Sequence, residues 1–97
     1  MNKEFFGSKS VTTVPVRISG DDTVVYRLLR GYMPEIDGDI YSLLVSLYEN
    51  GELTDETYAF DICRDTERAE AIFDLAVKYE VLPSSFADTF EYMLDLL

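Results

Sequence analysis

The side chains that could perform chemistry in this chain are almost all carboxylates. Its 97 residues include 19 Asp and Glu, one Cys and no His. Without His, the chain lacks the usual general acid and base, the usual activator of Ser or Cys nucleophiles, and the commonest zinc ligand. Only a carboxylate pair could then act as acid and base, and it would have to converge in a partly apolar cleft. We therefore expect no catalytic residue, no metal ligand and no cofactor, and we rank a carboxylate-only enzyme last.

The remaining candidates for a site are one cysteine and two short acidic loops, at Asp21-Asp22 and at Asp37-Gly38-Asp39. Asp37 and Asp39 match the first and third positions of a calcium-binding loop, but Tyr41 stands at the fifth and Tyr48 at the twelfth, where Glu belongs. We interpret the loops as turns, which Asp and Gly favour. Cys63 precedes an expected helix N-terminus, a place that can activate a thiol, but an inert structural cysteine is far more common. The five glycines form no phosphate-binding motif.

The charge of the chain is strongly negative and unevenly distributed. Residues 1–34 carry five basic and three acidic side chains, whereas residues 35–97 carry three basic and 16 acidic ones, so that +2 and −13 give the net charge of −11. Proteins bind nucleic acid by neutralising phosphates with Lys and Arg, so we expect no direct contact with DNA or RNA. The acidic part should attract a basic protein surface, although solubility alone is the simpler explanation of the same charge.

Composition also indicates the compartment and the size of the core. A single cysteine cannot form an intramolecular disulfide, which favours a reducing compartment. We find no signal-peptide pattern and no run approaching the roughly 20 apolar residues of a membrane helix. The expected location is therefore the cytoplasm, without a membrane partner. A hydrophobic content of 47% with seven Tyr and six Phe is typical of one domain with a modest core.

The elements that must carry these residues begin with strands. β-Branched and alternating segments separated by turn signals predict four of them, at residues 11–18, 23–30, 40–48 and 57–63. Pro15 cannot donate a ladder hydrogen bond, which places the first strand at an edge of the sheet. Segment 40–48 is long enough for a helix, but its alternating faces favour a strand. After Asn50 and Gly51 we expect a hairpin loop longer than two residues, extending through Glu56.

Alternation also assigns side chains to the two faces of each strand. In the second strand, Val25 and Arg27 should face away from Tyr26 and its even-numbered neighbours. In the last strand, Tyr58, Phe60 and Ile62 should share one face.

Two helices follow the strands. Asp65 or Thr66 should cap the first, whose apolar residues recur at helical spacing, and Pro83 follows its end. The second begins at Ser84 or Ser85, and Ser85 with Asp88 resembles a capping box. The buried stripe of this final helix should comprise Phe86, Phe90, Met93, Leu94 and Leu97. Tyr92 and Leu96 widen its apolar arc beyond what one packing surface requires.

These elements predict an α+β fold, with a three- or four-stranded antiparallel meander followed by a C-terminal two-helix hairpin packed on one face. The chain should form a single domain over residues 1–97. Within it we expect an N-terminal arm at 1–10, the antiparallel sheet at 11–63 and the helical hairpin at 64–97.

The second half of the chain resembles a family of short uncharacterised bacterial proteins. The similarity lies in residues 57–75 (TYAFDICRDTERAEAIFDL) and 81–94 (VLPSSFADTFEYML). In that family a strand enters a helix of the pattern D-x-x-x-A-x-x followed by two hydrophobic residues, and a V-x-P step leads into a terminal helix. Cys63 and Arg64 stand where those proteins often have Ile-Ser. The resemblance implies a strand–helix–helix order and no particular activity.

We expect the protein to be an interaction or regulatory module without catalytic activity. It would bind another protein, or a second copy of itself, through the C-terminal helix. The residues we expect to make this contact are Phe86, Asp88, Phe90, Glu91, Met93, Asp95, Leu96 and Leu97. The alternative is a nucleic-acid mimic or antitoxin-like inhibitor, whose carboxylates imitate phosphates on a basic protein.

Overall fold

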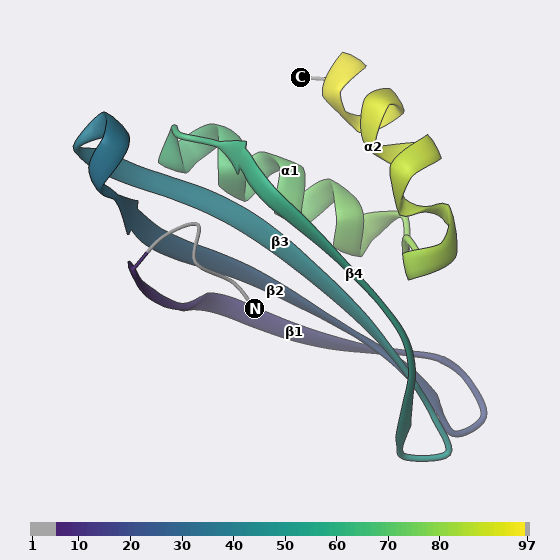
Figure 1. The fold of residues 1–97 in the computed structure, drawn as a ribbon. Helices are drawn as coiled ribbons and strands as arrows, with labels where there is room; N and C mark the ends of the chain where they lie inside the picture. Colours follow the sequence, from purple (N-terminus) through teal and green to yellow (C-terminus); the bar gives the residue numbers. More distant parts are fainter. Residues whose placement is uncertain (1–5, 97) are drawn as a thin grey trace.

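The computed structural model describes residues 6–96, in which four strands precede two helices. The elements are β1 (Phe6–Ser19), β2 (Asp22–Met33), the 3-10 turn η1 (Pro34–Ile36), β3 (Gly38–Glu49), β4 (Glu52–Cys63), α1 (Thr66–Lys78), the 3-10 turn η2 (Pro83–Ser85) and α2 (Phe86–Asp95). Each strand pairs antiparallel with the next, in the order β1-β2-β3-β4. Both helices pack on the sheet, α1 along one face and α2 next to α1 on the β4 side (Figure 1). This confirms the predicted α+β meander with C-terminal helices.

The strands are longer than the sequence pattern predicted. β1 starts at Phe6, so residues 6–10, predicted as part of an N-terminal arm, belong to the first strand. Pro15 lies in β1, which is an edge of the sheet as expected, because an edge strand tolerates the missing N–H donor. Segment 40–48 is a strand, and lies within β3.

The turn between β3 and β4 is tighter than predicted. We expected a loop through Glu56, but β4 already starts at Glu52 and only Asn50 and Gly51 connect the strands. Both have positive φ, 55° and 85°, which is the backbone of the two-residue turn whose twist matches paired strands. The prediction was wrong because four of the five residues from Glu52 to Glu56 are polar, which indicates a loop, although strand pairing needs only backbone groups.

The helix-covered face of the sheet holds the core. Val24, Tyr26 and Leu28 of β2 lie opposite Leu47, Val45 and Leu43 of β3, and the even and odd positions of β2 face opposite sides as predicted. From the helices, the core receives Ala69, Phe73, Ala76, Phe86 and Met93. Burial of these side chains is the main force that holds the helices on the sheet.

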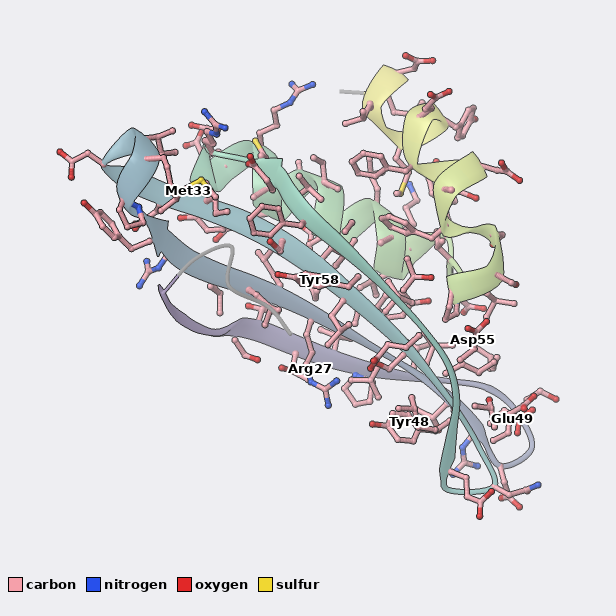
Figure 2. The ribbon with its side chains drawn as sticks, in the orientation of Figure 1. Arg27, Met33, Tyr48, Glu49, Asp55 and Tyr58 are labelled. Atoms are coloured by element: carbon pink, nitrogen blue, oxygen red, sulfur yellow. The ribbon has the colours of Figure 1, made fainter. Side chains whose placement is uncertain are left out.

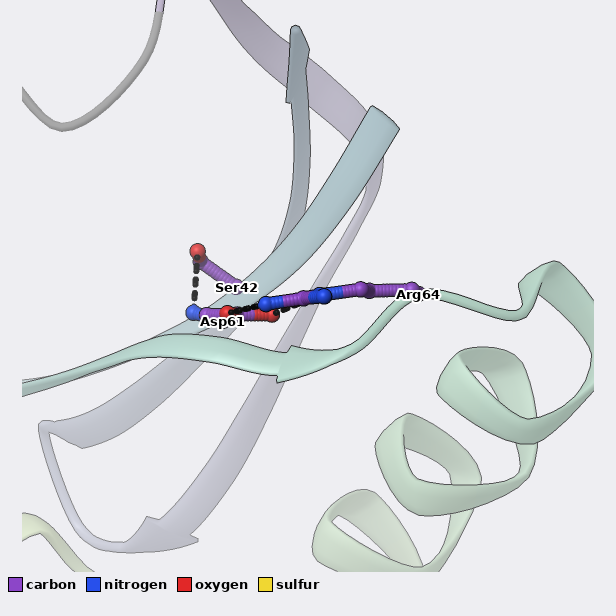
Figure 3. Close-up of polar contacts among 3 residues, drawn as sticks. All are labelled: Ser42, Asp61 and Arg64. Atoms are coloured by element: carbon purple, nitrogen blue, oxygen red, sulfur yellow. Dashed lines mark hydrogen bonds and ion pairs between the residues drawn. The ribbon is translucent and has the colours of Figure 1, made fainter. Parts of the chain in front are cut away.

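A β-bulge near the end of β4 overturns one face assignment. Leu43 pairs with Ala59 but Tyr41 pairs with Cys63, so the register shifts between them. Asp61 adopts a φ of 57°, which Asp tolerates better than most residues, and donates its N–H to Ser42 Oγ at 3.1 Å. Its carboxylate pairs with Arg64 at 3.0 Å (Figure 3). Ile62 therefore packs against the core with Cys63 instead of sharing a face with Tyr58 and Phe60.

The two helix N-termini differ in their caps. Asp65 caps α1 as predicted, because its carboxylate accepts a hydrogen bond from the N–H of Arg68 at 2.9 Å. The capping box predicted for α2 is absent. Ser85 makes no side-chain cap, and its hydroxyl lies 3.3 Å from the carbonyl of Leu82. The reason is that η2 already turns residues 83–85, so the hydroxyl points back to the turn before α2.

We predict that Gly51→Ala lowers the free energy of unfolding by about 1 kcal/mol, because a Cβ at this positive φ is strained although nothing lies near it. Gly38→Ala is the matched control. Its Cβ would meet only the carbonyl oxygen of Ile36 at 3.7 Å, an ordinary contact, so its stability should stay the same or rise by about 0.5 kcal/mol. Urea denaturation of both variants measures the difference. An equal loss of unfolding free energy in Gly51→Ala and Gly38→Ala would contradict the role given to the positive φ of Gly51 in the tight turn.

Candidate protein-binding surface

Three side-chain hydrogen bonds fix the helical segment to the sheet. The hydroxyl of Tyr26 donates to the carbonyl of Val81 at 3.0 Å, and that of Thr57 donates to the carbonyl of Pro83 at 2.9 Å. The hydroxyls of Tyr41 and Thr66 lie 2.6 Å apart at the start of α1. The connection between α1 and α2 is therefore held at two points, which sets the direction in which α2 leaves the sheet.

The end of α1 explains how Val81 reaches Tyr26. Glu80 adopts a left-handed φ of 50°. The N–H of Val81 donates to the carbonyl of Ala76, and the N–H of Glu80 to that of Val77, both at 3.1 Å. These two bonds form a Schellman motif, which reverses the chain after α1. Glycine is the usual residue at the left-handed position, so the sequence carries a small backbone strain here.

This reversal brings two exposed tyrosines together. Tyr79 at the end of α1 and Tyr92 of α2 are 44% and 58% exposed, and their rings lie edge to face with centroids 6.4 Å apart. The ammonium of Lys78 lies 5.7 Å from the centre of the Tyr79 ring. Leu96 is 46% exposed and follows Tyr92 by one helical turn. An exposed apolar cluster of this kind is typical of a contact surface.

Carboxylates flank the cluster along α2. Asp88, Glu91 and Asp95 are all exposed and lie on one side of the helix by their spacing. A second exposed stripe follows α1, at Glu67, Glu70 and Asp74. We define the α2 surface as Tyr79, Asp88, Glu91, Tyr92, Asp95 and Leu96. Its combination of aromatic rings with carboxylates offers both partners that a guanidinium group needs.

The structure separates the predicted contact residues into two groups. Asp88, Glu91, Asp95 and Leu96 are exposed, whereas Phe86 and Met93 are buried in the core and Phe90 is partly buried against it, 5.3 Å from the Phe86 ring. Leu97 lies outside the described residues. The two residues that widened the apolar arc, Tyr92 and Leu96, are the exposed ones. Sequence reasoning missed Tyr79, because only the angle between the helices brings it to Tyr92.

Other candidate sites gain no support from geometry. Asp37 is the left-handed residue that ends η1, in keeping with turn chemistry. Cys63 is half-buried, and its Sγ contacts the backbone of Asp65, with the Asp65 N–H donating at 3.4 Å. Over residues 6–96 we find no cavity and no group of three acidic or Cys side chains arranged to hold a metal. No helix in this part of the chain is long and apolar enough to cross a bilayer.

Comparison of the chain with protein-family models, with curated proteins and with solved structures finds no match. The resemblance to short bacterial proteins therefore stays a prediction.

Burial raises the pKa of the Tyr26 phenol from 10 to about 12, and the negative charge of Glu80 adds to the shift. Because the unfolded chain ionises at the lower value, Tyr26 contributes stability that is complete below pH 10 and is lost as the pH rises through about 12. Tyr26→Phe leaves the Val81 carbonyl without this donor and should cost about 1 to 2 kcal/mol at neutral pH. We predict that the difference between wild type and variant shrinks between pH 10 and 12.

Urea denaturation at a series of pH values measures this difference. Tyr92→Phe is the control, since the Tyr92 side chain is 58% exposed, whereas Tyr26 is fully buried. A gap between wild type and Tyr26→Phe that stays constant over the same range would contradict the role given to the hydrogen bond.

Proposed function

We propose that the protein is an interaction or regulatory module, without catalytic activity, that binds an arginine-rich protein surface through the α2 surface. The observation that carries this proposal is the exposed Tyr79–Tyr92 pair with Leu96 beside it, bordered by three carboxylates. Aromatic residues in an exposed cluster are the side chains on which protein contacts most often depend.

The chemistry of the surface selects the partner. A guanidinium group can stack on a tyrosine ring and donate two parallel hydrogen bonds to the two oxygens of one carboxylate, which an ammonium cannot match. The net charge of −11, concentrated in residues 35–97, would also speed the approach of a basic partner. The ammonium of Lys78 lies 5.7 Å from the centre of the Tyr79 ring, which is the kind of cation–aromatic contact that we expect from a partner's guanidinium.

Self-association through the same helix is the weaker choice for this surface. In a symmetric dimer the same surface patch of both copies forms the contact. Asp88, Glu91 and Asp95 would then face the same three carboxylates, and opposed like charges weaken an interface. A basic partner turns this repulsion into attraction.

We predict that Tyr92→Ala and Leu96→Ala each weaken binding of an arginine-rich peptide about tenfold, because truncating a central contact residue commonly costs more than 1 kcal/mol. Isothermal titration calorimetry with arginine-rich, lysine-rich and acidic peptides of equal length measures the effect. Leu53→Ala is the matched control, as Leu53 is 50% exposed but lies in the β3–β4 hairpin.

Binding should also weaken as salt is raised, since exposed charges are screened beyond about 10 Å at 0.1 M salt. Neutralising Asp88 and Glu91 to Asn and Gln should reduce this salt dependence, whereas Asp21→Asn in the β1–β2 turn should not. Equal affinity for the three peptides, or equal losses in Leu53→Ala and Leu96→Ala, would refute the proposal.

A further inference from the structure

The exposed side of α2 carries two rows of side chains that run along the helix axis. The carboxylate row consists of Asp88, Glu91 and Asp95, which are all exposed. At about 100° per residue, these three positions lie within about 60° of one another around the axis. By the same spacing they lie opposite Phe86 and Met93, which are buried in the core. The carboxylate row is therefore the part of α2 that points furthest from the core.

The apolar row lies next to the carboxylate row. Tyr92 and Leu96 are 58% and 46% exposed and lie one helical turn apart. Around the axis, Tyr92 lies about 40° from Asp88, and Leu96 lies about 40° further on the same side. The ring contact between Tyr92 and Tyr79 continues this row to the end of α1. A partner that covers α2 thus meets charge on one side and apolar surface on the other.

The spacing of the carboxylates along the axis matches the spacing of side chains on a second helix. With a rise of about 1.5 Å per residue, Glu91 lies about 4.5 Å beyond Asp88, and Asp95 about 6 Å beyond Glu91. Arginines three and four residues apart on another helix have the same spacing, so all three can face a carboxylate. On one side of an extended chain, arginines recur about every 6.6 Å, so the third would lie about 3 Å past Asp95. A helix therefore keeps its arginines in register with the row, whereas an extended chain does not.

The backbone of α2 gives an extended chain nothing to pair with. Most of its N–H and C=O groups form hydrogen bonds within the helix, whereas an added strand needs the free edge of a sheet. Over residues 6–96 we find no pocket that could hold a proline-rich extended segment either. An extended chain across Tyr92 and Leu96 would thus cover apolar side chains with unpaired backbone groups, which is unfavourable. A helix pairs these groups internally.

We propose that the α2 surface recognises an amphipathic α-helix of its partner, with arginines at positions i, i+4 and i+7 of one stripe and apolar residues beside them. This inference rests on the proposed function, because it takes the arginine-rich partner from there and adds its conformation. The two helices lie side by side, so that the arginines donate to the carboxylate row and apolar side chains cover Tyr92 and Leu96. Helices that bind along an apolar surface place their contact residues at this helical spacing.

Isothermal titration calorimetry with three alanine-based peptides of equal charge tests the inference. Each has about 16 residues, long enough to form an isolated helix, and three arginines. The first places the arginines on one stripe at i, i+4 and i+7, and the second spreads them around the helix at i, i+5 and i+10. The third is extended, with two prolines and arginines at i, i+2 and i+4. We expect the first peptide to bind at least about tenfold more tightly than either of the others.

The outcomes separate this inference from the proposed function. Circular dichroism of the free peptides checks that the first two have equal helix content. If the second or the third peptide binds as tightly as the first, the helical partner is overturned and the arginine-rich partner stands. If none of the three binds, the inference and the proposed function are both overturned.

Two double variants test whether the carboxylate row makes the distinction. Asp88→Asn/Asp95→Asn removes both ends of the row, so the affinities of the first two peptides should come within about threefold of each other. Glu49→Gln/Glu52→Gln is the matched control, because it removes the same charge at exposed positions of the β3–β4 hairpin. Figure 2 shows Glu49 at the hairpin end of the sheet, away from α2.

The hairpin variant should keep the full preference of the wild type for the first peptide. A preference that survives in Asp88→Asn/Asp95→Asn, or that is lost equally in both variants, would contradict the role given to the carboxylate row. Circular dichroism of the two variants confirms that each is folded.

Discussion

The hydrogen bond from Tyr26 to the carbonyl of Val81 is the constraint on which the arrangement of the domain depends. It crosses from the centre of β2 to the chain reversal after α1, 55 residues further along the sequence. A buried carbonyl needs a donor, and in this fold the phenol of a core residue supplies it. Because the reversal is fixed to the sheet, α2 can leave only toward β4, and Tyr79 meets Tyr92 as a result.

Packing both helices on one side gives the sheet two unlike faces. The centre of the covered face is largely apolar, as the burial of Val24, Leu28 and Leu43 shows. The other keeps partly exposed apolar residues at its centre and charges at its two sides. An antiparallel sheet can leave one face in water, but such a face is usually polar.

The sequence predicted the order and type of the four strands and the two α-helices, because hydrophobic spacing differs between strands and helices. The sequence-based predictions were wrong at positions where the polarity of the side chains indicates one local structure and the backbone adopts another. Most residues from Glu52 to Glu56 are polar, yet they pair with β3 through the backbone, and the side chains of Thr54 and Glu56 add hydrogen bonds to that strand. Ser85 has the right spacing for a capping box, yet η2 turns its hydroxyl toward Leu82. Asp61 breaks the alternation of β4 through a bulge, for which the side-chain pattern gives no signal.

The sequence by itself determined the chemistry that this protein carries, since the absence of His and the excess of carboxylates follow from residue types alone. It also determined the α+β class. Only the tertiary structure decided which apolar residues of α2 are buried and which are exposed, placing Phe86 and Met93 in the core and Tyr92 and Leu96 outside. The physical reason is that an apolar arc fixes how much surface a helix can bury, whereas the neighbours that it meets fix which side is buried.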